Sequence, residues 1–217
     1  RRRSNHAGEA PELAKQTLDI LVAGVGGQGN ILASRIVGDA AMKAGYHVAI
    51  GETFGMGQRG GPVSSHIRIG RTEIYGPLIP SQQCEVVVGL EPLEALRNAV
   101  RFLVKDGVVV TNTRAIIPVE VTTMGYPYPA VEEIVNSCLR IPAKVYTLDS
   151  YALAEKTGGY ITQNIVMIGA LAGTGVVPVT EDQLKEAIRE RLGRAAEQNV
   201  KAFELGREAV LKQREAT

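Results

Sequence analysis

Residues 18–29, which read LDILVAGVGGQG, decide the fold. The first part of this stretch is a short apolar run that ends in glycine, a pattern typical of a buried strand in a parallel sheet. Behind the glycines, apolar residues recur at helical spacing from Ile31 to Ala44, and Gly45 ends the predicted helix. A further strand over residues 47–50 completes a predicted strand–helix–strand unit, which is right-handed by default.

The rest of the chain repeats this alternation of strands and helices. Apolar runs at residues 84–90 and 107–113 predict two more parallel strands, joined by a helix over residues 93–103. A strand over residues 144–150 ends the predicted sheet. The remaining residues are helical, and residues 163–173 are apolar on nearly every side, so this helix is expected to be buried. We predict an α/β fold with a Rossmann-like, mostly parallel open sheet and C-terminal helices.

Composition and charge narrow the possible classes of protein. The chain has 217 residues, 45% of them hydrophobic, and its 24 Lys and Arg against 23 Asp and Glu leave a net charge of +1. This balance argues against a disordered chain and against a strongly basic nucleic-acid binder. No apolar run reaches the roughly 20 residues that a bilayer requires, so we expect a cytoplasmic protein without a membrane partner. We predict a flexible arm over the polar residues 1–17 and one folded domain over residues 18–217.

The cysteines bear on metal and redox chemistry. Cys84 and Cys138 are the only two in the sequence, and they lie far apart. An iron–sulfur cluster or a structural zinc site needs about four ligands, mostly thiolates, so we predict no metal site in this chain. Any redox metal would have to belong to another chain, and both thiols are expected to be inert packing groups.

The first candidate site is the loop between the first strand and the first helix, with Gly24, Gly26, Gly27, Gln28 and Gly29 as candidate phosphate-binding residues. Its glycines fit the pattern G-x-G-x-x-G, in which missing side chains allow a tight turn and close approach of a phosphate to the amides of the helix N-terminus. Glu52 lies near the end of the next predicted strand, where a ribose-binding carboxylate would be expected. From these residues alone the loop is either a dinucleotide site or a turn that only packs the helix on its strand.

The second candidate site lies in residues 51–61, GETFGMGQRGG, where the candidates are Met56, Gln58, Arg59, Gly60 and Gly61. We expect no regular strand in this glycine-rich segment. Because it follows the carboxyl end of a strand, it should lie beside the first glycine loop. The segment is either a clamp, in which Gln58 and Arg59 reach an anionic cofactor or a neighbouring subunit, or a mobile surface loop.

The strand after this segment is predicted to be half-buried, with Ser64, His66 and Arg68 on its polar face. His66 could act as an acid–base group, but a lone histidine on a strand is more often structural. We therefore predict no catalytic residue in this chain. Residues 126–129 form a stiff Tyr-Pro-Tyr-Pro loop that suits either an interface contact or simple packing.

The two glycine loops together resemble one protein family. GVGGQG, followed by GMGQRGG running into PVSSHIRIG, is similar to the gamma-type subunits of 2-oxoacid:ferredoxin oxidoreductases, and most similar to the beta subunits of the indolepyruvate branch. The resemblance extends from about residue 18 to the C-terminal helix and includes TQNIVMIGALAG at residues 162–173. The family usually has Ser or Ala where this chain has Gly57, and the particular oxoacid stays open.

The resemblance implies a complex that converts a 2-oxoacid and coenzyme A into an acyl-CoA and carbon dioxide and passes electrons to ferredoxin or another acceptor. Thiamine diphosphate, Mg²⁺ and iron–sulfur clusters would lie in partner subunits. This chain would shape the active site on its coenzyme A side without carrying a redox centre. Residues 26–29 would face a phosphate or an interface, and Gln58 and Arg59 would contact the coenzyme or support the groups that do.

Two other functions stay open from the residues alone. One is a self-sufficient NAD(P)-dependent oxidoreductase that uses the first glycine loop and Glu52. The other is a structural scaffold in which both glycine loops serve packing only.

Overall fold

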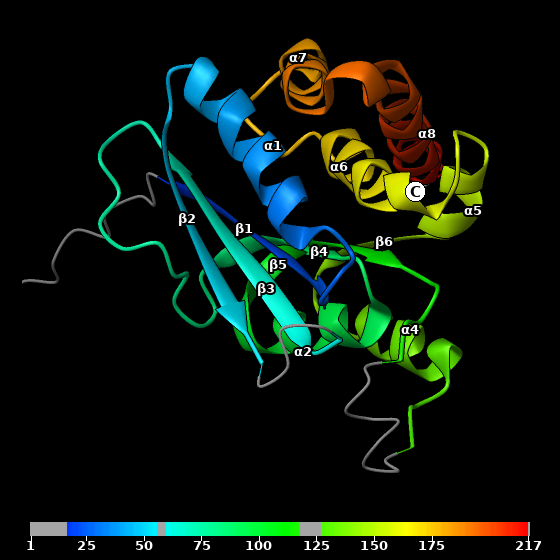
Figure 1. The fold of residues 1–217 in the computed structure, drawn as a ribbon. Helices are drawn as coiled ribbons and strands as arrows, with labels where there is room; N and C mark the ends of the chain where they lie inside the picture. The colour runs from blue at the N-terminus through cyan, green and yellow to red at the C-terminus, as the bar shows by residue number, and fades with distance from the viewer. Residues whose placement is uncertain (1–16, 56–59, 118–126, 217) are drawn as a thin grey trace, which may run out of the picture.

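A computed structural model describes residues 17–55, 60–117 and 127–216, and within them six strands form one sheet in the order β2-β3-β1-β4-β5-β6 (Figure 1). The strands are β1 (Thr17–Val25), β2 (His47–Phe54), β3 (Pro62–Gly70), β4 (Cys84–Gly89), β5 (Leu103–Asn112) and β6 (Lys144–Leu148). β1, β4, β5 and β6 run parallel, and β3 is antiparallel to both of its neighbours. The predicted α/β fold with a mostly parallel sheet and C-terminal helices is confirmed.

Helices cover both faces of the sheet (Figure 1). The helices are α1 (Asn30–Lys43), α2 (Pro92–Phe102), α4 (Val131–Leu139), α5 (Ser150–Glu155), α6 (Gln163–Gly173), α7 (Glu181–Leu192) and α8 (Ala196–Glu215), with short 3₁₀ turns η1 (Tyr160–Thr162) and η2 (Gly193–Ala195). One face carries α1, α6, α7 and α8, and the other carries α2 and α4. The alternation of side chains along β1 supplies both layers, because Ile20 and Val22 pack toward α1 and α6 whereas Leu21 and Ala23 pack toward α2.

β1, α1 and β2 form the predicted strand–helix–strand unit, and its two strands run parallel because each is antiparallel to β3. β3 lies between them and pairs with both. The sequence pattern predicts the strand at β3 but not its lateral place, so its antiparallel insertion between β1 and β2 was not predicted.

The expectations for residues 51–61 and for the next strand also need correction. β2 continues to Phe54, so the first residues of the glycine-rich segment are strand. β3 is buried on both faces rather than half-buried, because α2 and the segment between β3 and β4 cover its polar face, where His66 is only 2% exposed. The arm at residues 1–16 and residues 118–126 lie outside the described residues, whereas Thr17, predicted in the arm, begins β1.

The buried helix α6 packs directly on α8, as its apolar sequence predicts. Two glycines allow this contact: a Cβ on Gly169 would lie 1.9 Å from the Phe203 carbonyl oxygen, and one on Gly206 would lie 1.8 Å from the Val166 carbonyl oxygen. The backbones of the two helices therefore touch at a crossing that admits no side chain on either glycine.

Candidate functional site

The two glycine loops meet at the carboxyl edge of the parallel strands. The Gly26 amide donates a hydrogen bond of 2.9 Å to the carbonyl oxygen of Gly61, which directly precedes β3. The expectation that the two loops lie side by side therefore holds at Gly61. Met56, Gln58 and Arg59 lie outside the described residues. The carboxyl edge is the place where open α/β sheets bind ligands, so the loops occupy the position expected of a site.

The Gln28 side chain folds beneath the first loop and is 8% exposed. Its Oε1 accepts from the Val25 amide at 2.7 Å, and its Nε2 donates to the Leu90 carbonyl oxygen at 2.9 Å. A Cβ on Gly24 would lie 2.7 Å from Gln28 Oε1, so the glycine makes room for this buried amide. The buried Gln28 side chain therefore supports the loop from beneath, and the outer surface of the loop consists of backbone.

A buried chain of amides ties the loop to the ends of three other strands. Gln163 Nε2 donates to the Gln28 carbonyl at 3.0 Å and its Oε1 accepts from the Ser150 hydroxyl at 3.2 Å. Asn112, the last residue of β5, accepts from the Ser150 amide at 3.0 Å and donates to the Leu90 carbonyl at 3.1 Å. Sequence reasoning missed this network, although polar residues directly at strand ends, such as Asn112, are a signal for it.

The N-terminus of α1 opens onto this loop without a side-chain cap. The residue before the helix, Gly29, has φ +86° and offers no cap, and the first turn holds no acidic residue. The first amides of this 14-residue helix therefore point toward the loop without a side-chain acceptor from the cap. No carboxylate in the first turn offsets the partial positive charge at this end of the helix dipole. Gly29 has no room for a side chain, since a Cβ would lie 2.4 Å from Asn164 Nδ2.

Gly27 is the exposed tip of the loop. Its φ of +102° is a conformation that residues with a side chain rarely adopt, and no atom lies within 4 Å of a Cβ placed there. The loop thus presents bare backbone toward solvent at its tip, which is the surface that a phosphate group needs for close approach.

Two hollows flank the loop and share Gly26, Gly27 and Gly29. One, of about 390 Å³, is bounded further by Tyr151, Tyr160, Ile161 and Asn164 among others. The second, of about 270 Å³, is bounded further by Asn30, Ile31, Phe54 and Val63. Ile161 is 76% and Tyr160 67% exposed, so the rim of the larger hollow offers apolar surface to a neighbour.

Asn30 at the smaller hollow has incomplete hydrogen bonding. Its Nδ2 donates weakly to the carbonyls of Val22 at 3.4 Å and Val63 at 3.3 Å. Its Oδ1 has no partner among the described residues, although the side chain is buried.

Tyr151 lines the larger hollow, and the Arg114 guanidinium lies 5.2 Å from the centroid of its ring. Burial raises the pKa of the Tyr151 hydroxyl, and its hydrogen bond with Gln28 and the charge of Arg114 oppose this shift.

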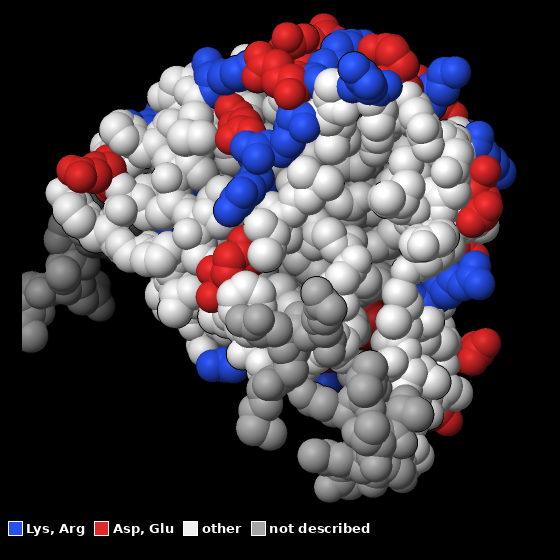
Figure 2. All heavy atoms as spheres, in the orientation of Figure 1, with Lys and Arg blue, Asp and Glu red and all other residues white. Residues whose placement is uncertain are grey.

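Charged side chains are unevenly spread over the face seen in Figure 2. They gather mainly at the top, over α1, α7 and α8, with smaller groups left of centre and along the right side, while the surface over α6 is uncharged. Part of the charged cluster links the helices to one another, since Arg191 Nε on α7 contacts Asp39 on α1 at 2.9 Å and Lys185 contacts Glu204 on α8 at 3.1 Å. These exposed pairs stabilise each helix contact by at most about 1 kcal/mol.

Glu52, the carboxylate that a dinucleotide site would need for the ribose, is hydrogen-bonded within the chain. Glu52 accepts from the Ser34 hydroxyl of α1 at 3.2 Å and from the Ser65 hydroxyl of β3. Its strand, β2, lies beyond β3 and not beside β1. The NAD(P) alternative therefore finds no support in the structure.

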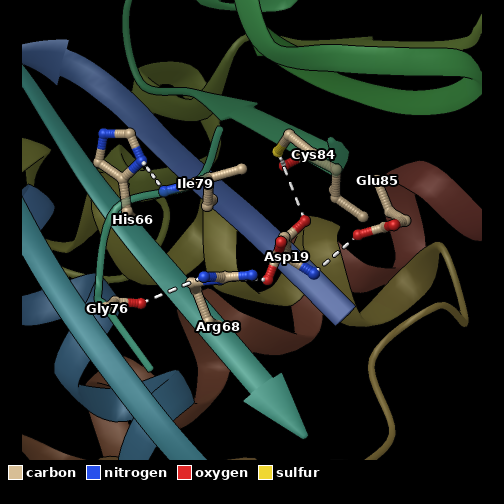
Figure 3. Close-up of polar contacts among 8 residues, drawn as sticks. Asp19, His66, Arg68, Gly76, Ile79, Cys84 and Glu85 are labelled. Carbon is tan, nitrogen blue, oxygen red and sulfur yellow. Dashed lines mark hydrogen bonds and ion pairs between the residues drawn. The ribbon is translucent and has the colours of Figure 1, made fainter. Parts of the chain in front are cut away.

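His66 lies midway along β3, opposite Leu21 of β1, beside a buried polar cluster at the amino end of β1 (Figure 3). Its Nδ1 accepts from the Ile79 amide at 3.2 Å, and its ring packs edge-on against Phe102 with centroids 5.3 Å apart. Burial and the nearby Arg101 charge lower the pKa of His66, with Asp19 opposing, so the ring is held neutral. The structural role favoured from the sequence is consistent with these contacts.

Arg68 binds the same cluster to the segment between β3 and β4. Its Nε contacts Asp19 Oδ1 at 3.0 Å and its Nη1 donates to the Gly76 carbonyl at 3.2 Å, as Figure 3 shows. The Asp19 amide donates to Glu85 at 2.7 Å, and the Cys84 thiol donates to the Asp19 carbonyl. The cluster therefore fastens a surface segment to three strands, far from the glycine loops.

Tyr128 and the two cysteines, which the sequence also singled out, have structural roles. The Tyr128 hydroxyl donates to the buried carboxylate of Glu91, which also caps α2 by accepting from the Glu94 amide at 2.9 Å. Burial raises the pKa of Glu91, and these two hydrogen bonds oppose the shift. Burial and the hydrogen bond to Glu91 both raise the pKa of Tyr128.

Both cysteines are buried, and burial raises the pKa of the Cys138 thiol to about 11. The described residues contain no group of three or more His, Cys, Asp or Glu side chains placed to hold a metal ion.

The family model described as pyruvate ferredoxin/flavodoxin oxidoreductase matches residues 19–209. This chain belongs to that family. The match spans both glycine loops, the amide network and the crossing of α6 with α8, so the whole site lies inside the family domain.

Relatives of this family are similar over most of their length. The chain is 42% identical over 190 residues to the indolepyruvate oxidoreductase subunit IorB of Archaeoglobus fulgidus, which covers 87% of this chain and 93% of that protein. It is 31% identical to the pyruvate/ketoisovalerate oxidoreductases common subunit gamma of Pyrococcus abyssi, over 85% of this chain and 92% of the relative. The resemblance to gamma-type subunits, and to the indolepyruvate branch, is confirmed.

Solved structures share the fold. The gamma subunit of a keto/oxoacid ferredoxin oxidoreductase from Geobacter sulfurreducens matches with a TM-score of 0.67 and 23% identity, over 90% of this chain and 99% of that one. A 2-oxoglutarate:ferredoxin oxidoreductase from Magnetococcus marinus, determined with 2-oxoglutarate, coenzyme A and succinyl-CoA bound, matches with a TM-score of 0.68 and 22% identity, over 92% of this chain and 32% of that one. Among the described residues, no helix combines the length and apolarity that crossing a membrane requires.

Proposed function

We propose that this chain is a subunit of a thiamine diphosphate-dependent 2-oxoacid:ferredoxin oxidoreductase and forms the coenzyme A side of its active site without carrying a redox centre. The complex would convert a 2-oxoacid and coenzyme A into an acyl-CoA and carbon dioxide, and two electrons would pass to ferredoxin or another acceptor. Thiamine diphosphate, Mg²⁺ and iron–sulfur clusters would be held by partner subunits in the cytoplasm.

One observation carries the proposal. The first glycine loop meets Gly61 of the second at the carboxyl edge of the sheet through the Gly26 hydrogen bond, in a chain of this family. The names of the relatives supply the reaction class, since they are subunits of indolepyruvate and pyruvate/ketoisovalerate oxidoreductases. The 42% identity to the former favours an aryl-substituted oxoacid for the whole complex.

The residues at the loop suit an anionic group such as a phosphate of coenzyme A. The amides of the uncapped start of α1 and the bare backbone of Gly27 offer donors, and the chain supplies no carboxylate in the first turn to compete with the anion. Coenzyme A supplies the thiol that accepts the acyl group. This chain would bind and orient it, and Tyr160 and Ile161 would pack on a partner subunit and exclude water from the same edge.

The matched pair Gly27→Asp and Gly27→Asn, tested in the assembled complex, separates binding of an anion from packing. Both side chains strain the backbone equally, and they differ by one negative charge. Near the solvent a like charge at about 4 Å costs between about 1 and 4 kcal/mol. The Asp variant should raise the apparent KM for coenzyme A at least about fivefold over the Asn variant, with kcat at saturation similar.

Gly193 provides the control site, because its φ is +49° and no atom lies within 4 Å of a Cβ there. Gly193 directly follows α7 and begins η2. Gly193→Asp and Gly193→Asn should have the same kcat and the same apparent KM for coenzyme A as each other. Equal effects of Asp and Asn at Gly27 would reject the anion site and favour the scaffold alternative.

Arg59→Ala tests the second loop in the same assay: the scaffold alternative requires unchanged turnover and unchanged apparent affinity for coenzyme A.

The absence of a redox centre is tested separately with the purified chain. Alone, it should show no 2-oxoacid-dependent reduction of a dye, and activity should return when the companion subunits are added. Robust activity of the isolated chain would contradict the proposal whatever the outcome at Gly27.

A further inference from the structure

Two amide side chains begin the buried helix α6, whose remaining residues are apolar or small. Gln163 and Asn164 are each 3% exposed, and they belong to the stretch at residues 162–173 that resembles the family. A buried amide costs free energy unless its donors and its acceptor are satisfied. The atoms that these two side chains contact therefore indicate what they do.

Both side chains turn their nitrogens toward the first glycine loop. Gln163 Oε1 accepts from the Ser150 hydroxyl at 3.2 Å, which leaves Nε2 to donate to the Gln28 carbonyl at 3.0 Å. Asn164 Oδ1 accepts from the next backbone amide of α6 at 3.0 Å, and its Nδ2 donates to the Gly29 carbonyl at 3.3 Å. Because each oxygen is held by another donor, neither side chain can present its oxygen to the loop without losing a bond. Two successive loop carbonyls are thus held toward α6.

The direction of the Gln28 carbonyl sets the direction of the Gly29 amide. The peptide bond between these residues is trans and planar, so its N–H points opposite to its C=O. The Gly29 amide therefore points away from Gln163, and it has no hydrogen-bond partner among the described residues. Gly29 itself has left-handed backbone, φ +86° and ψ +26°, at the start of α1. Such a turn gathers successive amides into a concavity that suits an anion.

We propose that Gln163 is a positioning residue for coenzyme A, with Asn164 as its companion at the next carbonyl. The Gln163 amide holds the Gln28 carbonyl inward and so keeps the Gly29 amide turned toward the phosphate. Without this donor the Gln28 carbonyl is free to rotate outward, where its partial negative charge would repel the anion. The inference rests on the proposed function, because it concerns the same loop, and it assigns a role to side chains 135 residues further along the chain.

Gln163→Met, studied in the assembled complex, removes the donor with little change of side-chain volume. One lost hydrogen bond corresponds to about fivefold in binding, so the apparent KM for coenzyme A should rise about fivefold. The kcat at saturating coenzyme A and the apparent KM for the 2-oxoacid should stay within about twofold of wild type, because only binding of the coenzyme is weakened. Ser150→Ala frees the Gln163 oxygen but spares the donor, so it should raise the KM for coenzyme A by only about twofold.

Gln213→Met is the matched control, because Gln213 also holds backbone groups with its side-chain amide. It accepts from the Thr147 amide at 3.2 Å and donates to the Thr147 carbonyl at 3.0 Å, on the edge strand β6 and not at the loop. This variant should destabilise the chain but leave the apparent KM for coenzyme A within about twofold of wild type.

Amide hydrogen exchange of the full chain alone gives a second readout that needs no activity. The Gly26 and Gln28 amides are hydrogen-bonded to backbone carbonyls, so their exchange reports on opening of the loop. Exchange at both amides should be at least about threefold faster in Gln163→Met and close to the wild-type rate in Gln213→Met.

The outcomes separate this inference from the proposed function. If the Gly27→Asp and Gly27→Asn pair shows the charge effect while Gln163→Met keeps the wild-type KM for coenzyme A and the wild-type loop exchange, the positioning role is overturned and the proposed function stands. A Gln163→Met variant whose kcat, or KM for the 2-oxoacid, worsens as much as its KM for coenzyme A has lost only structure, and this too overturns the role. Equal effects of Asp and Asn at Gly27 would overturn both proposals. Should Gln163→Met fail to assemble, Ser150→Ala decides, and an unchanged KM for coenzyme A in that variant overturns the role.

Discussion

Gln28→Leu tests whether the buried amide under the first glycine loop holds the loop in place. The two side chains are similar in size, so the change removes hydrogen bonds with little change of volume. The Val25 amide loses its 2.7 Å acceptor in a buried position, while the Leu90 carbonyl keeps the bond from Asn112. One orphaned buried donor costs about 1–3 kcal/mol, and the lost bond to Leu90 adds up to about 1 kcal/mol. We expect the free energy of unfolding to fall by about 1–4 kcal/mol.

Thermal unfolding followed by circular dichroism measures this change. For a chain of this length about 1 kcal/mol shifts Tm by roughly 2–4 °C, so the variant should melt about 2–16 °C lower. Asn136→Leu, on the exposed side of α4, is the control and should alter stability by less than about 0.5 kcal/mol. A Gln28→Leu variant as stable as the control would refute the idea that this side chain supports the loop.

Three further predictions follow from contacts described above. Gly206→Ala should destabilise the chain by about 3 kcal/mol or more in denaturant titrations, because the new methyl group would overlap the Val166 carbonyl; a variant with unchanged midpoint would show that the helices separate freely. The lowered pKa of buried His66 means that the folded chain binds fewer protons than the unfolded chain below pH 6.5, so stability present above pH 6.5 is lost as the pH falls. His66→Gln should remove this loss, and His47→Gln at an exposed position should retain it. Burial and the raised pKa of Cys138 should keep it from reacting with a thiol reagent in the native chain, and rapid modification before unfolding would contradict its packing.

Most of the elements could be predicted from the sequence, because hydrophobic periodicity is a local signal. The helix after the first glycine loop, the buried helix over residues 163–173 and the parallel strands on one side of β1 all appear where the pattern placed them. The lateral position of β3 could not be predicted in this way, since strand order depends on pairing between distant segments. Its burial on both faces likewise depends on contacts with α2 that are distant in the chain, such as those of His66 with Phe102 and of Ser64 with Asn98.

The candidate site was only partly accessible from sequence. The glycines and their strand–turn–helix context marked the loop, because positive φ and close approach select glycine. The sequence did not indicate that the Gln28 side chain would reach Leu90, or that Glu52 would bind Ser34 and Ser65, because these partners are distant in the chain. Spacing gives the position of a side chain along the backbone, but its partners depend on the assembled sheet.

The pairing of β3 with two strands fixes the described end of the second glycine loop. The strands pair with each other and β3 also pairs with β1 over nine residue positions, so they are anchored independently of the turn that joins them. Gly61, which precedes β3, and the first glycine loop, which follows β1, are joined by the Gly26 hydrogen bond at the ends of two strands that hold each other in register. A ligand that met this edge would therefore meet backbone whose position is set by the sheet, with little ordering left to be done on binding.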